Sequence, residues 1–272
     1  MCRRFIQWQK LCNICAVLSG YRCMRVIFAV VLMLLSPLAL GNAEAASARQ
    51  FSVATPGGNV LIESFRSSSG ASRPAVIVLS GSHGFVSPSY DELGQSLNAA
   101  GLDAYLVHLL SPADQKAIAG AGSSPARIAY YATRWQDWIA TVHGVVSYIK
   151  SEPYHTGKVG VFGLSLGAQT AAAASADSTD IAALVLADGA FPDGYSKAVR
   201  SLPPLYIVWG GADRTFPVST AQKLHQMAQG LGGSVSLNVY KDGPHNFFLK
   251  SGEQAKAAHQ SVVDFFVSQL SR

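Results

Sequence analysis

The segment Gly163–Gly167, Gly-Leu-Ser-Leu-Gly, matches the pattern G-x-S-x-G and is a candidate for nucleophilic chemistry. It directly follows the apolar run Lys158–Phe162 and precedes an Ala-rich helical pattern, Leu166–Ala176. A serine on such a tight strand-to-helix turn exposes its hydroxyl at the sheet edge, beside a helix N-terminus. We therefore predict that Ser165 is a nucleophile. The alternative is a Gly-Ser-Gly turn that only connects a strand to a helix.

A serine hydroxyl becomes reactive beside a general base, and His245 is the candidate base. When the nucleophile occupies this kind of turn, the acid and then the histidine follow it in the chain. Of the histidines after Ser165, His225 and His259 fall within helical patterns, where we expect solvated faces. His245 lies in the loop Asp242–Phe247, just past a strand pattern, although a histidine beside Gly-Pro can also simply shape a turn.

The base needs an acid to orient it, and two aspartates qualify. Asp213 follows the strand pattern Leu205–Trp209 after a Gly-Gly-Ala turn. Asp188 directly follows the strand pattern Ile181–Ala187. A catalytic acid can extend from the end of either strand, so the residues leave both open, with capping of a turn or lining of a pocket as the other role for Asp188.

Acyl transfer also requires an oxyanion hole, which is a pair of backbone N–H groups facing the developing negative charge. We expect one donor to be Leu166, the residue after the serine. The other should come from the loop Ser80–Phe85, which follows the strand pattern Ala75–Leu79, and we predict the N–H of Ser82, with that of His83 as the next candidate. The neighbouring His83 either contacts substrate or stabilises the loop.

Strand and helix patterns alternate over nearly the whole chain, which predicts a mostly parallel sheet with helices on both faces. The expected fold class is a three-layer α/β domain without a large cap. The segment Ser111–Ser124, rich in Ser, Gly and Ala, is expected to be a loop that could cover the site. The predicted strands are a pair within Phe51–Phe65, then Ala75–Leu79, Asp103–Leu109, Lys158–Phe162, Ile181–Ala187, Leu205–Trp209 and Val235–Tyr240, and the helices are Ser89–Ala100, Ala126–Lys150, Leu166–Ala176, Val218–Leu231 and Glu253–Leu270.

Three segments together resemble the α/β-hydrolase superfamily: the motif Gly163–Gly167, the loop Trp209–Asp213 and the loop Gly243–Phe247. The short form without a large cap is similar to the dienelactone hydrolase family and its esterase and peptidase relatives. The resemblance covers roughly residues 50–272 and implies the α/β-hydrolase fold, with an eight-stranded sheet.

The resemblance also implies a triad of Ser165, His245 and Asp213, and it favours Asp213 over Asp188. Dienelactone hydrolases carry a cysteine nucleophile where this chain has Ser165, and an acidic residue near the position of Gly81. These differences indicate an ordinary serine esterase. The predicted reaction is hydrolysis of a small-molecule carboxylic ester through an acyl-enzyme, without metal or organic cofactor. The alternatives are a peptidase or amidase of the same superfamily, or a catalytically idle hydrolase fold that binds ligands.

Candidate substrate contacts lie in the Ser111–Lys150 region and beside Asp213. Arginines there could anchor a substrate carboxylate or could be ordinary surface residues: Arg127, Arg134 and Arg214. Aromatic residues at helical spacing could line the pocket or belong to the core: Tyr130, Tyr131 and Trp135.

The charge distribution argues against nucleic acid as a partner. The whole chain has 21 basic and 16 acidic residues, of which five basic and one acidic residue precede Ala46. The remaining 227 residues therefore carry 16 basic and 15 acidic residues, a net charge of +1. A nearly neutral body lacks the basic surface that binds a polyanion.

The first 45 residues are predicted to be a secretory signal peptide. Met24-Arg25 precedes the apolar run Val26–Leu40, and Ala43-Glu44-Ala45 provides small residues where a signal peptidase cleaves. The alternative, an uncleaved anchor, needs about 20 apolar residues, and this shorter run contains Pro37. We expect cleavage after Ala45, a catalytic domain of residues 46–272 without a stable membrane anchor, and export to the periplasm or the medium.

The cysteines support this division of the chain. All of them precede Met24, at Cys2, Cys12, Cys15 and Cys23, so the mature domain can form no disulfide. The pair Cys12 and Cys15 has no second ligand pair at metal-binding spacing. Because this segment fits poorly in front of a signal peptide, translation could start at Met24 instead of Met1.

Overall fold

The computed structural model describes residues 48–67 and 71–271. The predicted signal peptide and its cleavage site lie outside the described residues. The two alternative start positions, Met1 and Met24, do so as well.

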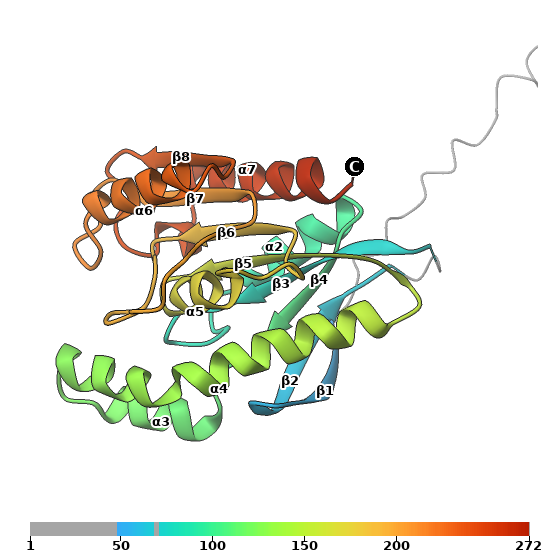
Figure 1. Cartoon of the computed structure of the whole chain (residues 1–272), viewed down its shortest axis with the longest axis horizontal. Helices are drawn as coiled ribbons and strands as arrows, with labels where there is room; N and C mark the ends of the chain where they lie inside the picture. Colours follow the sequence, from blue (N-terminus) through green and yellow to red (C-terminus); the bar gives the residue numbers. More distant parts are fainter. Residues whose placement is uncertain (1–47, 68–70, 272) are drawn as a thin grey trace, which may run out of the picture. The chain divides into compact units, whose positions relative to one another are not determined.

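One eight-stranded sheet runs through the described residues, in the order β1-β2-β4-β3-β5-β6-β7-β8 (Figure 1). Strand β2 pairs antiparallel with β1 and with β4, and the other neighbours pair parallel. The sequence prediction of an eight-stranded, mostly parallel sheet is therefore confirmed. The strands are β1 (Arg49–Thr55), β2 (Gly58–Phe65), β3 (Arg73–Leu79), β4 (Asp103–Val107), β5 (His155–Leu164), β6 (Ala183–Ala187), β7 (Leu205–Gly210) and β8 (Val235–Tyr240).

The central strands consist of continuous apolar, β-branched runs because helices cover both of their faces. Ala75–Leu79 in β3 and Ala183–Ala187 in β6 are fully buried. The parallel register pairs Leu79 with Gly163 and Leu164 with Ala187, so the carboxyl ends of β3, β5 and β6 meet at one edge. Residues that follow these strands are thereby brought together at the edge where Ser165 lies.

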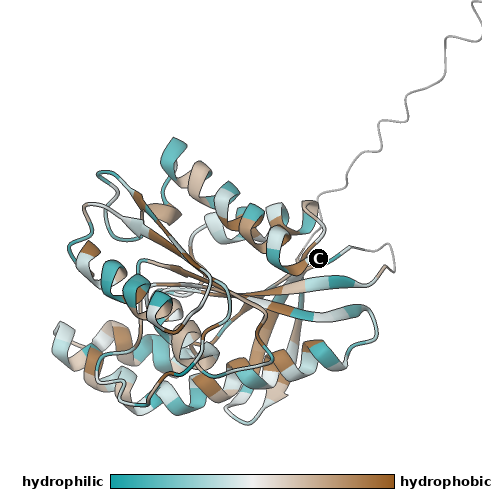
Figure 2. Cartoon of the chain, turned by 45° about the horizontal axis from the view of Figure 1, so that its top comes forward, coloured by the Kyte–Doolittle hydropathy of each residue, from teal (hydrophilic) through white to brown (hydrophobic). Residues whose placement is uncertain are grey.

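Helices cover the two faces of the sheet in separate groups. Helices α2 and α7 share one apolar cluster with one face, and α4, α5 and α6 share another with the opposite face. Figure 2 shows apolar residues concentrated in the strands, whereas the helices alternate between apolar and polar residues. The three-layer prediction is confirmed. The helices are α2 (Ser89–Ala99), α3 (Pro112–Gly120), α4 (Ser124–Ser151), α5 (Leu166–Ser175), α6 (Val218–Gly230) and α7 (Glu253–Leu270), with a 3-10 turn η1 (Phe247–Leu249).

Among the described helices, none is both long enough and apolar enough to cross a lipid bilayer.

The prediction of a loop over Ser111–Ser124 is wrong, because helix α3 occupies most of this segment. Ser111 begins it with a capping box: its hydroxyl accepts from the Asp114 N–H, and the Asp114 carboxylate accepts from the Ser111 N–H. Pro112 fits the first helical turn, where its missing N–H is not needed. The small residues that indicated a loop are thus compatible with a short capped helix.

Helix α4 has 28 residues, which corresponds to a length of about 42 Å. Its C-terminal half packs on the sheet through Val142, Val145 and Ile149. Its N-terminal half instead lies along α3, and both contribute to a separate apolar cluster that contains Ile118 and Trp138 (Figure 1). Helix α4 therefore packs on the sheet with its C-terminal half and on α3 with its N-terminal half.

The expectation for His259 is also wrong. This histidine stacks on Phe248 with ring centroids 4.1 Å apart, and its Nε2 lies 2.9 Å from the Phe248 carbonyl oxygen. It packs between α7 and η1 and does not occupy a solvated face.

Candidate active site

Ser165 lies between β5 and α5 in a backbone conformation that L-residues rarely adopt, with φ 53° and ψ −112°. Its N–H donates to the Ala187 carbonyl at 2.9 Å, and its own carbonyl accepts from the Gln169 N–H at 3.1 Å. These bonds hold the strained turn at the end of a buried strand. Such strain is concentrated at functional sites, where the surrounding structure maintains it.

The two glycines of the G-x-S-x-G motif are required by close backbone contacts. A Cβ on Gly163 would lie 2.4 Å from the Gly167 carbonyl oxygen. A Cβ on Gly167 would lie 2.4 Å from the Leu79 carbonyl oxygen at the end of β3. The motif therefore fits helix α5 closely between two strands, and this packing places Ser165 at the sheet edge.

The predicted residues Ser165, His245 and Asp213 form one continuous hydrogen-bonded chain. The Ser165 Oγ lies 3.0 Å from His245 Nε2, and His245 Nδ1 lies 2.8 Å from Asp213 Oδ2. These three side chains come from the β5–α5 turn, the loop after β8 and the loop after β7. The arrangement is able to move a proton from the serine hydroxyl to an oriented imidazole.

Further contacts hold Asp213 in position. Its side chain is fully buried, and its Oδ1 accepts from the N–H groups of Thr215 and Phe216 at 2.7 and 2.9 Å. The Phe216 ring packs against the His245 ring, with centroids 5.6 Å apart. Both carboxylate oxygens therefore have donors, which fixes the direction of Oδ2.

Asp188, the rival for the acid, lies beside this chain but binds backbone N–H groups. Its Oδ1 accepts from the Gly210 N–H at 2.8 Å, and its Oδ2 accepts from the Asn246 N–H at 2.9 Å. Asp188 therefore links the start of the loop that contains Asp213 to the loop that contains His245. Burial, together with the nearby Asp213 carboxylate, raises the pKa of Asp188 to about 6.

Oxygen and nitrogen atoms of Asp188, Asp213 and His245 lie within 4.8 Å of one another, a spacing that could hold a metal ion. In this structure the atoms bond to each other or to backbone N–H groups. This use of their lone pairs favours a proton-transfer site over a metal centre.

The predicted oxyanion donors lie beside Ser165. Leu166 begins helix α5, and Ser82 lines the same cavity as Ser165 and His245. In the loop after β3, the Gly81 N–H donates to the buried Tyr90 hydroxyl at 3.0 Å, so it is already used. This leaves Ser82 and the next residue, His83, which also lines the cavity, as candidate donors.

A cavity of about 1020 Å³ opens above Ser165. Its size is at the upper end of the range for small-molecule sites. One side of it is formed by what we call the α3–α4 wall. The wall consists of Gln115, Ile118 and Ala119 from α3 and Ser124, Arg127, Ile128, Tyr131 and Trp135 from α4. The other lining residues include Gln169, Asp193, Arg214, Thr215, Phe216 and Asn246.

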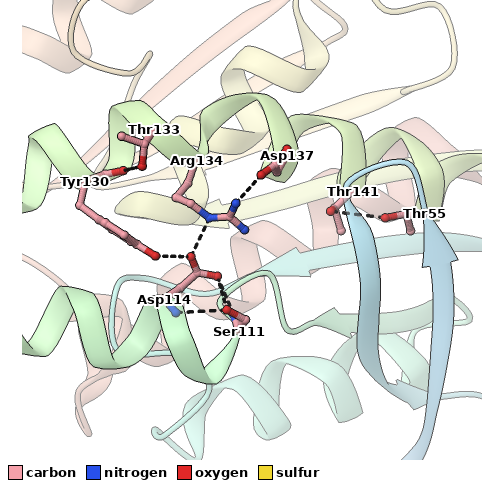
Figure 3. A network of polar contacts seen from close by, with 8 residues as sticks. All are labelled: Thr55, Ser111, Asp114, Tyr130, Thr133, Arg134, Asp137 and Thr141. Atoms are coloured by element: carbon pink, nitrogen blue, oxygen red, sulfur yellow. Dashed lines mark hydrogen bonds and ion pairs between the residues drawn. The ribbon is translucent and has the colours of Figure 1, made fainter.

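The structure separates the candidate substrate contacts into two groups. Arg127, Arg214, Tyr131 and Trp135 line the cavity. Arg134 and Tyr130 do not, because both bind Asp114 on α3 (Figure 3).

Asp114 is the centre of the polar network that joins α3 to α4. It is 1% exposed, and its carboxylate accepts from the Tyr130 hydroxyl at 2.7 Å and from Arg134 Nε at 2.8 Å. The Ser111 hydroxyl also donates to the Asp114 carboxylate, at 2.7 Å. Arg134 in addition forms an ion pair with Asp137 (Figure 3). Burial opposes the charge, but these donors outweigh it and lower the pKa of Asp114. The network fixes the position of the α3–α4 wall.

Sequence reasoning did not identify Gln169, Phe216 or Asn246 as cavity residues. Phe216 and Asn246 are close in sequence to Asp213 and His245, and this proximity is a usable signal. For Gln169, the signal is a lone amide in an Ala-rich helix that follows the nucleophile by one turn.

The eight-stranded sheet, the strained serine turn and the hydrogen-bonded Ser-His-Asp chain define the class of the protein as an α/β hydrolase. Within this class, the family model "Dienelactone hydrolase family" matches residues 64–270. The chain belongs to the dienelactone hydrolase family and is a hydrolase. The resemblance seen in the sequence is confirmed.

Solved structures with the same fold include enzymes of several kinds. A dienelactone hydrolase from Anabaena variabilis is 19% identical, with a TM-score of 0.68 over 83% of this chain and 99% of that chain. A cold-adapted esterase from an Arctic intertidal metagenomic library is 17% identical, with a TM-score of 0.64 over 82% and 94%. An acylaminoacyl peptidase from Pyrococcus horikoshii is 13% identical, with a TM-score of 0.64 over 85% and 43%. No curated protein matches the chain.

Proposed function

We propose that this protein is a serine hydrolase that cleaves carboxylic esters of small molecules through an acyl-enzyme intermediate. The observation that carries the proposal is the hydrogen-bonded chain from Ser165 Oγ through His245 to Asp213, with distances of 3.0 and 2.8 Å. A serine hydroxyl is a weak nucleophile until a positioned base accepts its proton. His245 is that base, and the cavity above Ser165 has space for the ester.

In the first half of the reaction, Ser165 Oγ attacks the ester carbonyl carbon while its proton passes to His245 Nε2. The carbonyl oxygen becomes an oxyanion, which the N–H groups of Leu166 and Ser82 stabilise. His245 Nδ1–H continues to donate to Asp213, which stays ionised and stabilises the imidazolium. The intermediate then expels the alkoxide, which takes the proton from Nε2 and leaves as an alcohol.

In the second half, water replaces the alcohol. His245 accepts a proton from water as its oxygen attacks the acyl carbon, and a second oxyanion forms between the same two N–H groups. Collapse of this intermediate breaks the bond to Ser165 Oγ, which recovers its proton from Nε2. The products are a carboxylic acid and the free enzyme, and the chemistry uses groups of this chain alone.

Active-site labelling tests this proposal. Residues 46–272 are treated with a fluorophosphonate probe, which reacts with activated serines, beside the variants Ser165→Ala and His245→Ala. A matched control is His225→Ala, since His225 lies in α6 outside the cavity. We expect labelling and hydrolysis of p-nitrophenyl butyrate by the wild type and the control, and by neither active-site variant. A folded wild type without labelling would favour the ligand-binding alternative.

An amidase or peptidase activity is the second candidate, because a Ser-His-Asp triad does not by itself separate esters from amides. The fold shared with an acylaminoacyl peptidase supports it, although this chain spans less than half of that chain. Comparison of an acyl ester with the anilide of the same acid distinguishes the two. We expect the ester to be cleaved and the anilide to remain intact.

We also propose that the protein is exported, with a signal peptide over residues 1–45 and cleavage after Ala45. The charged start, the apolar run and the small residues at the cleavage site support this proposal. N-terminal sequencing of the protein recovered from outside the cytoplasm should begin at Ala46. Retention of the full chain in the membrane fraction would contradict cleavage.

A further inference from the structure

Helix α5 follows the nucleophile and is buried along its whole length. Its sequence is Leu-Gly-Ala-Gln-Thr-Ala-Ala-Ala-Ala-Ser, in which small residues allow close packing on the sheet. Gln169 is the exception in size and polarity. It is only 5% exposed, yet it lines the cavity above Ser165. A long polar side chain at such a position needs an explanation other than packing.

The Gln169 amide has no hydrogen-bond partner among residues 48–67 and 71–271. The next residue shows the contrast, because the Thr170 hydroxyl donates to the Leu166 carbonyl oxygen at 3.1 Å. Buried side-chain amides normally use their hydrogen-bonding capacity. The Gln169 amide instead faces the cavity, where a bound molecule can reach it.

The position of Gln169 relative to Ser165 is set by the helix. The two residues are separated by one turn, and the Gln169 N–H donates to the Ser165 carbonyl oxygen at 3.1 Å. Ser165 lies at the turn before α5 and Gln169 on the first turn of α5, and both line the same cavity. A substrate bound at Ser165 therefore places atoms a few bonds from its ester carbonyl beside Gln169.

The chemistry of the amide selects among substrate groups. Its nitrogen donates and its oxygen accepts, and it carries no charge. A carboxylate only accepts, so it would use the amide nitrogen and leave the amide oxygen without a donor, and an alkyl group would leave both functions without partners. A hydroxyl is the smallest neutral group that both donates and accepts, and it fits the short distance to the ester carbonyl.

We propose that Gln169 is a specificity-determining residue that binds a hydroxyl group a few bonds from the scissile ester. The preferred substrates are then esters of hydroxylated acids or of polyols. This proposal rests on the proposed ester hydrolysis and assigns a substrate class to the same site. A site with a buried polar group discriminates against an analogue that lacks the matching hydroxyl, because the polar group then loses its partner.

Two matched pairs of esters test the proposal. For the acyl side, p-nitrophenyl 3-hydroxybutyrate is compared with p-nitrophenyl butyrate, and for the alcohol side 3-hydroxybutyl acetate is compared with butyl acetate. The readout is the ratio of kcat/KM within each pair. We expect the wild type to prefer the hydroxylated ester by about tenfold in at least one pair.

The key variant is Gln169→Met, which keeps the length of the side chain and removes the amide. Its ratio should fall to near one. Gln169→Leu repeats the measurement with a different apolar shape, in case the first variant folds poorly. The matched control is Gln136→Met, because Gln136 is exposed on α4 and does not line the cavity. Its ratio should equal that of the wild type.

Either of two results would overturn the subsite: equal kcat/KM within both pairs for the wild type, or a preference that persists in both Gln169 variants. Fluorophosphonate labelling keeps this failure distinct from failure of the proposed function. An enzyme that is labelled at Ser165 and cleaves both esters equally is a serine esterase without the hydroxyl subsite. An unlabelled, inactive wild type would contradict the esterase itself.

Discussion

Two buried carboxylates, Asp188 and Asp213, extend from neighbouring strands and have different partners. Asp213 binds the imidazole of His245, whereas Asp188 binds two backbone N–H groups. Each follows a buried strand, Asp188 directly and Asp213 after a short turn, so their sequence context leaves the choice of acid open. The structure distinguishes them by which oxygen reaches His245 Nδ1.

The first prediction concerns Asp213. Asp213→Asn removes the charge that stabilises the imidazolium and disturbs the tautomer in which Nε2 accepts the serine proton. We expect kcat to fall by about 10³- to 10⁴-fold, by analogy with other Ser-His-Asp enzymes. The measurement is hydrolysis of p-nitrophenyl butyrate, with circular dichroism as the control for folding. A loss of less than tenfold would indicate that Asp188 is able to act as the acid.

The second prediction concerns the proton on Asp188. Its pKa of about 6 in the folded protein lies above the value of about 3.9 in an unfolded chain, so the native state binds this proton more tightly. The contribution of this proton to stability is therefore fully present below pH 4 and is lost as pH rises through 6.

Asp188→Asn has no such proton to lose. The destabilisation caused by this variant, measured by urea unfolding, should consequently shrink as the pH rises from 4 to 7. A difference that stays constant or grows over this range would show that the carboxyl is not held in its neutral form by burial.

At the scale of elements, the α3–α4 wall depends on Asp114. Asp114→Asn places an amide N–H₂ where donors from Ser111 or Arg134 now point, and leaves buried groups without acceptors. We expect a loss of about 1–3 kcal/mol in the free energy of unfolding. KM should rise more for bulky esters than for acetates, because the wall lines the cavity above Ser165 and a bulky ester fills more of that cavity.

The matched control for this third prediction is Asp137→Asn. Asp137 also pairs with Arg134, but its side chain is 50% exposed. Surface pairs contribute little, so a change within about 0.5 kcal/mol is expected. Equal effects of the two variants would mean that burial of Asp114 does not anchor the wall.

The fourth prediction concerns the packing of α5 against the strands. In Gly167→Ala the new methyl group would lie 2.4 Å from the Leu79 carbonyl oxygen, and neither backbone is free to move. We expect a loss of more than about 3 kcal/mol, or failure to fold. Gly230→Ala is the control, because a Cβ there meets nothing within 4 Å at the end of α6. It should be neutral or stabilise by up to about 1 kcal/mol.

Local patterns were sufficient to predict most elements, because apolar runs and helical spacing directly reflect burial between two layers. Helix α3 was the exception. Its residues have little apolar periodicity, and the helix is stabilised by Asp114 binding Tyr130 and Arg134, which come 16 and 20 residues later. The one local signal was Ser-Pro-Ala-Asp at 111–114, a capping box with proline in the first turn.

In the site, too, the features that depend on contacts between distant residues could not be predicted from the sequence. Ser165 was predictable because the turn that positions it is contiguous in sequence. Contacts between different loops were not predictable from sequence. Examples are the bond from the Asn246 N–H to Asp188 and the position of Gln169 in the cavity lining. Their roles depend on which strands are neighbours, and this order is a property of the folded sheet.

At the scale of the whole molecule, residues 46–272 contain no cysteine and depend on burial for stability. A domain of this size buries roughly 70% of the surface of its extended chain. We therefore predict, as the fifth test, that the urea midpoint of this domain is the same with and without reducing agent. A shift on reduction would indicate that residues before Ala46 are retained in the sample and form disulfides.

The α3–α4 wall is encoded by one uninterrupted stretch of chain, from Ser111 to Trp135. The nucleophile, the acid and the base all come later in the chain, in loops that follow β5, β7 and β8. Genetic exchange of that single stretch would replace one side of the cavity and leave Ser165, Asp213 and His245 unchanged in the sequence. A family built this way can change its range of substrates by recombination while its catalytic residues stay the same.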